Sequence, residues 1–280
     1  RSRTPHASPR LALSLPLPTG TTIAGSFALM HQQRMDPLVL DPVYGDADLL
    51  PERAFHLTAS VDQQILPGLV ARVEGWHKAF DHLVVFPDGP DAPRTGTWSN
   101  AGYGEASGLE LSVQARRGRA HGSLAYGLSR SVRSNPLATT MPIESAAGGD
   151  RRHFVHLGAD LELGRRRGLL IGADYLFRTG WAIGSLDRHM LDDGRTALWG
   201  VASLDDRRRP DLHRVSLRVE GTHMLRAIRI RGYVEVAAMA AGGGSIEDCQ
   251  AASPNAALPT CRDLDFLPSV MPWAGIRADW

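Results

Sequence analysis

The sequence predicts an all-β fold, an antiparallel transmembrane β-barrel meander of about 11 to 12 strands. Three observations predict this fold class. Apolar and polar residues alternate along most of the chain, and tight turns follow long connections in regular order. The sequence also holds no apolar run of about 18 residues that would form a membrane helix.

The alternation has a period of two, which places one set of side chains on each face of a β-strand. In the segment 109–116, the apolar set is Leu109, Leu111, Val113 and Ala115, and the polar set is Glu110, Ser112, Gln114 and Arg116. The segments 55–62, 155–163, 215–220 and 228–237 repeat the pattern. The charged face must meet water, whereas the apolar face needs a cover, which is either lipid or a second sheet.

The composition excludes one class of partner. The 280 residues include 31 basic and 30 acidic ones, and the net charge of +1 gives no electrostatic reason to expect nucleic acid binding. The mean hydropathy of −0.18 is compatible with a barrel, because only every second strand residue faces lipid. The 29 glycines and 18 prolines suit a chain with many turns.

Eleven strands follow from the alternation and the turn residues between them. They are expected at 10–17, 21–30, 53–65, 69–80, 106–115, 120–131, 154–163, 169–179, 212–220, 228–240 and 269–280.

The connections between these strands alternate strictly in length. Short ones are expected at 18–20, 66–68, 116–119, 164–168 and 221–227, and long ones at 31–52, 81–105, 132–153, 180–211 and 241–268. In an antiparallel meander, this order puts all short turns at one end and all long loops at the other. Outer-membrane barrels have this arrangement, whereas long loops are uncommon in compact soluble domains.

An antiparallel barrel cannot close with eleven strands, because the first and last would run parallel. We therefore expect further strands before Arg1. Without them, both edges of the sheet would leave unpaired backbone groups in lipid, and the isolated chain should not insert stably.

The two cysteines, Cys249 and Cys261, lie in one predicted loop with eleven residues between them. This placement predicts a disulfide formed in an oxidising compartment, with two free thiols as the alternative. Two sulfur atoms without a nearby histidine do not indicate a metal site.

Short motifs along the chain resemble, in collinear order, those of TonB-dependent outer-membrane receptors. The segment 49–54 is similar to the strand-opening L-x-P-E-x-A of that family, and 73–78 to v-E-a-Y-x-k, with Trp76 in place of Tyr. The segments 100–110, 125–131, 150–153 and 178–180 resemble N-x-G … G-x-E, S-Y-t-l-S-r-s, D-x-x-H and R-t-G. The chain departs from the family at Ser216, where Asp is common, and at 237–240, where Asn is usual.

The end of the chain resembles the closing strand of the same family. Residues 267–280 are similar to l-P-x-x-P-x-x-G-l-x-w-x-F, with Trp280 as the terminal aromatic that the barrel-assembly machinery recognises. The resemblance implies that residues 1–280 form the C-terminal half of a 22-stranded receptor barrel. The plug domain, the energy-coupling box and the first half of the barrel would then be absent before Arg1.

The resemblance also implies a location and an activity. Such receptors lie in the outer membrane of Gram-negative bacteria and take up a scarce small molecule or metal chelate, such as an iron–siderophore or cobalamin. Outer loops capture the ligand, and the TonB–ExbB–ExbD system moves the plug at the expense of the proton-motive force. Large aromatic or charged residues of the long connections are the candidate ligand contacts: Arg94, Trp98, His189 and Trp199.

We predict no enzyme activity, cofactor or metal site, because no catalytic or nucleotide-binding motif occurs. His153 and His156 should lie on opposite faces of a strand, and the charge run 205–209 should be a solvated loop. Aromatic residues near strand ends on the apolar face, among them Tyr126, Tyr175 and Phe177, are candidates for an interfacial girdle.

Three other classes of protein share parts of this pattern. An autotransporter translocation barrel has a similar length and a terminal aromatic, but it would carry a lumen-spanning helix that residues 1–9, with Pro5 and Pro9, do not resemble. A passive porin would need an inward-folded loop with clustered acids. A soluble β-sandwich that binds a ligand would be expressed without detergent.

Overall fold

The structure, a computed structural model, describes most of the chain. The described residues are 6–33, 48–85, 98–138, 144–147, 149–164, 168–190, 197–225, 228–241, 246–250, 260–264 and 270–279. These ranges are all-β. Within them, no helix is long and apolar enough to cross a membrane.

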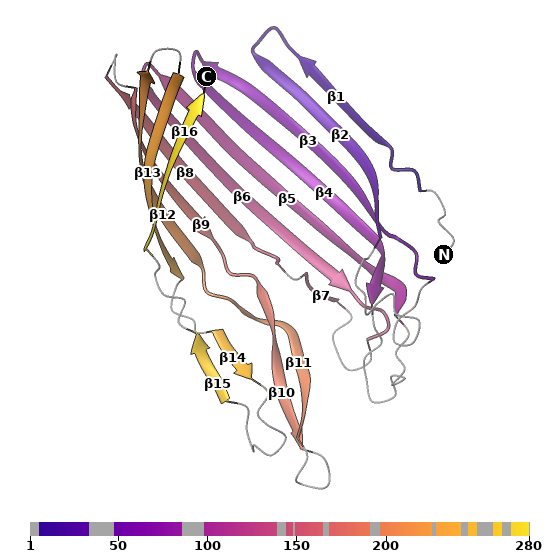
Figure 1. Cartoon of the computed structure of the whole chain (residues 1–280). Helices are drawn as coiled ribbons and strands as arrows, with labels where there is room; N and C mark the ends of the chain where they lie inside the picture. Colours follow the sequence, from indigo (N-terminus) through magenta and orange to yellow (C-terminus); the bar gives the residue numbers. More distant parts are fainter. Residues whose placement is uncertain are drawn as a thin grey trace.

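The main element is one antiparallel sheet of 12 strands, arranged as a meander that is not closed (Figure 1). Eleven of its strands follow one another in chain order: β1 (Arg10–Pro16), β2 (Thr21–Gln32), β3 (Glu52–Leu66), β4 (Leu69–Val85), β5 (Ser99–Arg117), β6 (Ala120–Ser134), β8 (His153–Leu163), β9 (Leu169–Arg178), β12 (Leu212–Leu225), β13 (Ile228–Ala241) and β16 (Val270–Asp279). The short β7 (Glu144–Ala146) pairs with β6 beside this path. The predicted meander and each of its strands are confirmed.

Two further hairpins correct the predicted connections 180–211 and 241–268. They are formed by β10 (Ala182–Met190) with β11 (Ala197–Arg208), and by β14 (Ile246–Gln250) with β15 (Thr260–Leu264). Each pairs only with itself, so its strands satisfy their hydrogen bonds locally instead of extending the main sheet. In Figure 1 both hairpins extend from the end of the sheet that carries the long connections.

The short turns lie together at the opposite end of the sheet, as predicted (Figure 1). Glycine is required at one of them for two reasons. Gly68 has a φ of 83°, and a Cβ atom there would lie 2.3 Å from the carbonyl oxygen of Arg116. The turn between β3 and β4 therefore packs directly against the end of β5.

Register fixes the two faces of the sheet. Val61, Val73, Leu111, Tyr126 and Val155 face each other in one row across β3, β4, β5, β6 and β8, so they share one face. We call this the apolar face. The row one residue away contains Asp62, Arg72, Ser112, Ala125 and His156, on what we call the polar face.

The apolar face is the exposed one. Leu217 is 59% exposed, whereas its neighbour Ser216 on the polar face is 1% exposed. The same contrast separates Val61 from Ser60, at 45% and 6%. Side chains on the inside of a curve crowd and shield each other, so this difference indicates a sheet curved toward its polar face. Such curvature is consistent with part of a β-barrel.

No second layer of protein covers the apolar face in the part of the chain that the structure describes. Apart from a contact between β11 and β7, the substantial contacts between strands join hydrogen-bonded neighbours. Leu109, Leu111 and Val234 are 51%, 37% and 55% exposed. The sandwich-type cover that a soluble protein would need is thus missing from the described residues.

A small apolar core lies at the loop end of β4, β5 and β6. Leu83, Val84, Ala106 and Val132 are all less than 9% exposed. A Cβ on Gly104 would lie 2.6 Å from the carbonyl oxygen of Val132, so glycine lets the two strands pack closely there.

Segments that resemble family motifs hold this core together. The Asn100 side chain accepts a hydrogen bond from the Leu50 amide and donates to the carbonyls of Leu50 and His82. Glu52 accepts a bond from the Val84 amide. These polar residues therefore have a structural role.

Candidate functional site

The polar face of β3, β4 and β5 carries a chain of charges. Arg72 forms an ion pair with Asp62 at 3.1 Å and a second one with Glu74 on its own strand. The indole of Trp76 donates to Glu110 on the next strand at 3.1 Å. These side chains lie along the wall of the sheet, and all of them have polar partners.

A hollow of about 430 Å³ opens on this part of the polar face. Its lining mixes charged, hydroxyl and aromatic groups, and the residues that matter here are Arg72, Glu74, Trp76, Glu110, Ser129 and Phe154. A wall of this kind gives a polar solute both hydrogen-bonding and stacking partners.

Glycines on the polar face make room for the large side chains. A Cβ on Gly108 would lie 2.6 Å from the Trp76 ring, and one on Gly275 would lie 2.5 Å from the Tyr233 ring. Each ring therefore occupies the place where a neighbouring strand has no side chain. The aromatic groups lie against the wall because of these two glycines.

A second polar stretch covers β8, β9, β12 and β13. His156 and Asp174 are 2.9 Å apart, and Arg218 pairs with Glu220 and lies 4.7 Å from the centre of the Tyr233 ring. Register places His153 and His156 on opposite faces of β8, as predicted.

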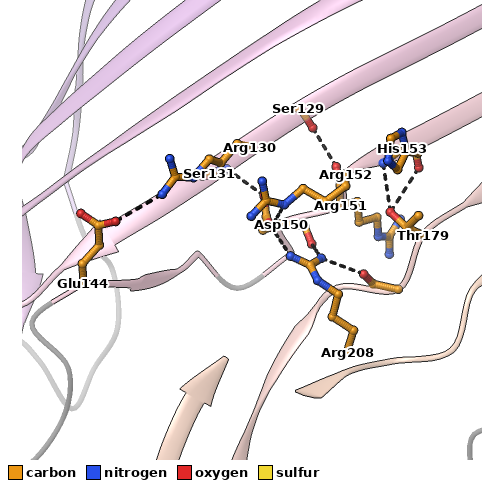
Figure 2. Close-up of polar contacts among 11 residues, drawn as sticks. Ser129, Arg130, Ser131, Glu144, Asp150, Arg151, Arg152, His153, Thr179 and Arg208 are labelled. Atoms are coloured by element: carbon orange, nitrogen blue, oxygen red, sulfur yellow. Dashed lines mark hydrogen bonds and ion pairs between the residues drawn. The ribbon is translucent and has the colours of Figure 1, made fainter. Parts of the chain in front are cut away.

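A buried carboxylate organises the loop end of the sheet between β6 and β9 (Figure 2). The Asp150 side chain is 1% exposed, and it is 2.7 Å from Arg208 and 3.1 Å from Arg152. The same carboxylate accepts a hydrogen bond of 2.8 Å from the amide of Ser131 on β6. The two arginines and the amide supply the hydrogen-bond partners that a buried carboxylate needs.

Arg208 links three segments through this carboxylate. Besides its ion pair, its guanidinium donates to the carbonyl oxygens of Asp150 and Gly180, both at 3.1 Å. The end of β11 is thus tied to the segment before β8 and to the segment after β9. The prediction of a loop at 205–209 is wrong for residues 205–208, which belong to β11, and Arg208 pairs with a carboxylate that lies 58 residues away in sequence.

Aromatic rings hold further arginines beside this junction. The guanidinium carbons of Arg151 and Arg209 lie 4.8 and 4.7 Å from the centre of the Trp181 ring. Arg178 lies 5.4 Å from the centre of the Phe154 ring. Desolvation and the nearby charge of Arg178 lower the pKa of Arg151, although an arginine with a lowered pKa still carries its charge at neutral pH.

The ligand contacts predicted from sequence stay a prediction, and the structure places three of the four residues along the chain. Arg94 lies outside the described residues. Trp98 directly precedes β5, which β6 and β8 separate from β9 in the sheet. His189 and Trp199 belong to the β10–β11 hairpin, where Trp199 pairs with the residue before His189.

The other singled-out residues have the following positions. Cys249 and Cys261 face each other in the register of β14 and β15, and their disulfide stays a prediction. Trp280 lies outside the described residues. Tyr126 and Tyr175 lie on the apolar face, and their hydroxyls are 2.9 Å from the Nδ1 atoms of His153 and His213.

Sequence reasoning did not find the arginine junction. The segments 150–153 and 178–180 had been singled out for their resemblance to family motifs, and 205–209 as a charge run, but nothing in the sequence indicated that these segments meet. In the described ranges, no group of three or more His, Cys, Asp and Glu residues is placed to hold a metal ion.

No protein-family model matches the sequence, and a search of curated proteins found no match.

Proposed function

We propose that this chain is the C-terminal part of the barrel of a TonB-dependent outer-membrane receptor. The receptor would take up a scarce small molecule or metal chelate, with energy from the TonB–ExbB–ExbD system. One observation carries the proposal: the single-layer sheet exposes a continuous apolar face and shelters a charged one. An exposed apolar surface of this extent needs a cover, and lipid provides one while the strands satisfy each other's backbone groups.

The dimensions of the apolar face support a position in the membrane. On β5, the charged residues Glu105 and Arg117 share this face and bracket Ser107, Leu109, Leu111, Val113 and Ala115. Twelve residues of strand span about 40 Å, or about 30 Å along the membrane normal at the tilt usual in such barrels. This equals the thickness of a bilayer hydrocarbon core.

The polar face suits the wall of a water-filled passage. Its ion pairs and hydroxyl groups would face the lumen, and the long connections would face the cell exterior. The wall of a barrel is similar in an energised receptor and in a passive channel, so the fold alone does not separate these two classes. The motif resemblance is what favours the energised receptor.

Lipid contact can be tested with spin labels on adjacent residues. Cysteines would be introduced singly at Leu111 and Ser112, in the complete gene product with Cys249 and Cys261 replaced by serine, and labelled after reconstitution. We expect a label at position 111 to collide with oxygen dissolved in lipid and a label at 112 to collide with a water-soluble nickel chelate. Equal access of both labels to the nickel chelate would contradict a membrane location.

Uptake by cells tests the transport activity. Cells with and without the gene would be compared for uptake of ferric chelates and cobalamin, with and without a protonophore. Uptake that requires both the gene and the proton-motive force supports the receptor. Gene-dependent uptake that the protonophore leaves unchanged would indicate a porin. A passenger protein that appears at the cell surface only when the gene is present would indicate an autotransporter.

A further inference from the structure

We infer that Arg151, Arg178 and Arg209, held beside Trp181 and Phe154, form a binding site for an anionic oxygen group, a carboxylate or a phosphate. The site lies at the loop end of the sheet, where β8 begins and β9 ends. It goes beyond the proposed function, because anion binding there does not depend on transport.

The first argument is the shortage of acceptors. Among the described residues, none of these three guanidinium groups has a carboxylate within ion-pair distance. Asp150 is occupied by Arg152, Arg208 and the Ser131 amide, and the carboxylate of Asp211 accepts a hydrogen bond of 2.9 Å from the Gly180 amide. Both of these carboxylates, which belong to the described residues, thus already accept hydrogen bonds from other groups.

The second argument is an unsatisfied donor. The Nε atom of Arg209 is buried and has no hydrogen-bond partner. A buried donor of this kind destabilises a structure unless a partner binds it. An aromatic ring attracts the charge of a guanidinium but does not replace the oxygen acceptors that its N–H groups need.

The third argument is the gathering of like charges. The guanidinium carbons of Arg151 and Arg209 lie 4.8 and 4.7 Å from the centre of the same ring, that of Trp181. Arg178 is close enough to Arg151 to repel its charge. A bound anion would remove this repulsion, and arginine matches the planar oxygen pairs of carboxylate and phosphate.

The backbone holds the site in place before any ligand binds. The Arg209 amide donates to the Trp181 carbonyl at 2.9 Å, and the Thr179 amide donates to the His153 carbonyl at 3.0 Å. Gly180 touches the backbone of Arg209 so closely that a Cβ would lie 1.5 Å from the Arg209 carbonyl oxygen. The backbone that carries the arginines is thus ordered already, and binding would not have to order it.

The position of the site indicates the source of the anion. Phe154, which lies under Arg178, also lines the hollow on the polar face. The site is thus reached from the polar face, which favours a water-soluble anion. A phosphate of the surrounding lipid is the other source of the same chemistry.

Titration calorimetry tests the site with two probes, citrate and inorganic phosphate, at constant ionic strength. The protein would be the complete gene product purified in detergent, alone and as the double variant Arg151→Gln/Arg209→Gln. We expect at least tenfold weaker binding in the double variant and partial recovery in Arg151→Gln/Arg209→Lys. Arg130→Gln is the matched control, because Arg130 is exposed at the same end of the sheet and pairs with Glu144.

The possible outcomes separate the interpretations. Two results would overturn the inference. The first is an equal loss of anion binding in the Arg130→Gln control. The second is that the unmodified protein binds neither probe and carries no co-purified lipid phosphate. Lipid phosphate that co-purifies with the protein and is lost in the double variant supports the site and assigns it to lipid. If the double variant does not fold, Arg151→Gln alone carries the test. Failure of uptake in cells would leave these results unaffected.

Discussion

Leu111 offers the sharpest test of which face of the sheet meets lipid. It lies on the apolar face of β5, between Val73 on β4 and Tyr126 on β6, and is 37% exposed. The nearest charged residues on the same face of this strand, Glu105 and Arg117, are each six residues away, or about 20 Å. An arginine side chain is far shorter than that, so its charge could not reach a partner or the membrane surface along the strand.

We therefore expect Leu111→Arg to lower the free energy of unfolding by about 2 to 4 kcal/mol, the cost of arginine at the middle of a bilayer. This corresponds to a roughly 30- to 1,000-fold change in the folding equilibrium. Gln114→Arg is the control, because Gln114 is on the polar face of the same strand and is exposed. It should change the unfolding free energy by less than about 1 kcal/mol.

The measurement is urea-induced unfolding of the complete gene product in phospholipid vesicles, followed by tryptophan fluorescence. Equal destabilisation by both substitutions, or a larger effect of Gln114→Arg, would refute the assignment of the faces. A protein that stays folded and monodisperse in water without detergent would refute it as well.

Three other predictions concern single contacts. Gly108→Val should displace the Trp76 ring and lower the unfolding free energy by about 1 to 3 kcal/mol. Gly75→Val is the control and should change this free energy little, because the space around Gly75 is open. Equal effects of the two substitutions would contradict the packing of Trp76 against Gly108. Asp150→Asn should lower the same free energy by about 2 kcal/mol, since it leaves two arginines without their buried partner. Glu144→Gln is the control and should have almost no effect, because the ion pair between Glu144 and Arg130 is exposed. Hydrogen exchange of the amides near β6 would report the difference. Cys249 and Cys261 should resist alkylation until a reductant is added, and labelling before reduction would count against the disulfide.

The strands of the main sheet could be predicted because each one repeats the same local rule. In 109–116 and 228–237, the period of two follows from one face meeting water and the other meeting an apolar medium, and the turn glycines separate the strands. The segments 182–190 and 197–208 do not repeat this alternation, and the β10–β11 hairpin that they form pairs only with itself. Its strands were therefore missed.

The arginine junction could not be predicted because it depends on contacts between distant connections. Asp150 and Arg208 are 58 residues apart in sequence, and neither lies in a segment whose periodicity says which way its side chain points. Arg209 and Trp181 meet only after β11 has returned along β10. By contrast, Trp98, His189 and Trp199 were chosen by residue type alone, and the structure places Trp98 before β5 and the other two in the β10–β11 hairpin.

The rings of Trp76 and Tyr233 lie over Gly108 and Gly275 on the polar face. Their positions would affect the width of an aqueous passage along this face. Each ring fills the space that a side chain at the glycine would occupy, so a larger residue there would push the ring away from the strand. If the polar face lines a passage, as proposed, Gly108 and Gly275 would set its width through the rings that they accommodate. The size of solute admitted would then depend on the smallest residues in the wall, and a change at either glycine would narrow the bore while leaving every loop in place.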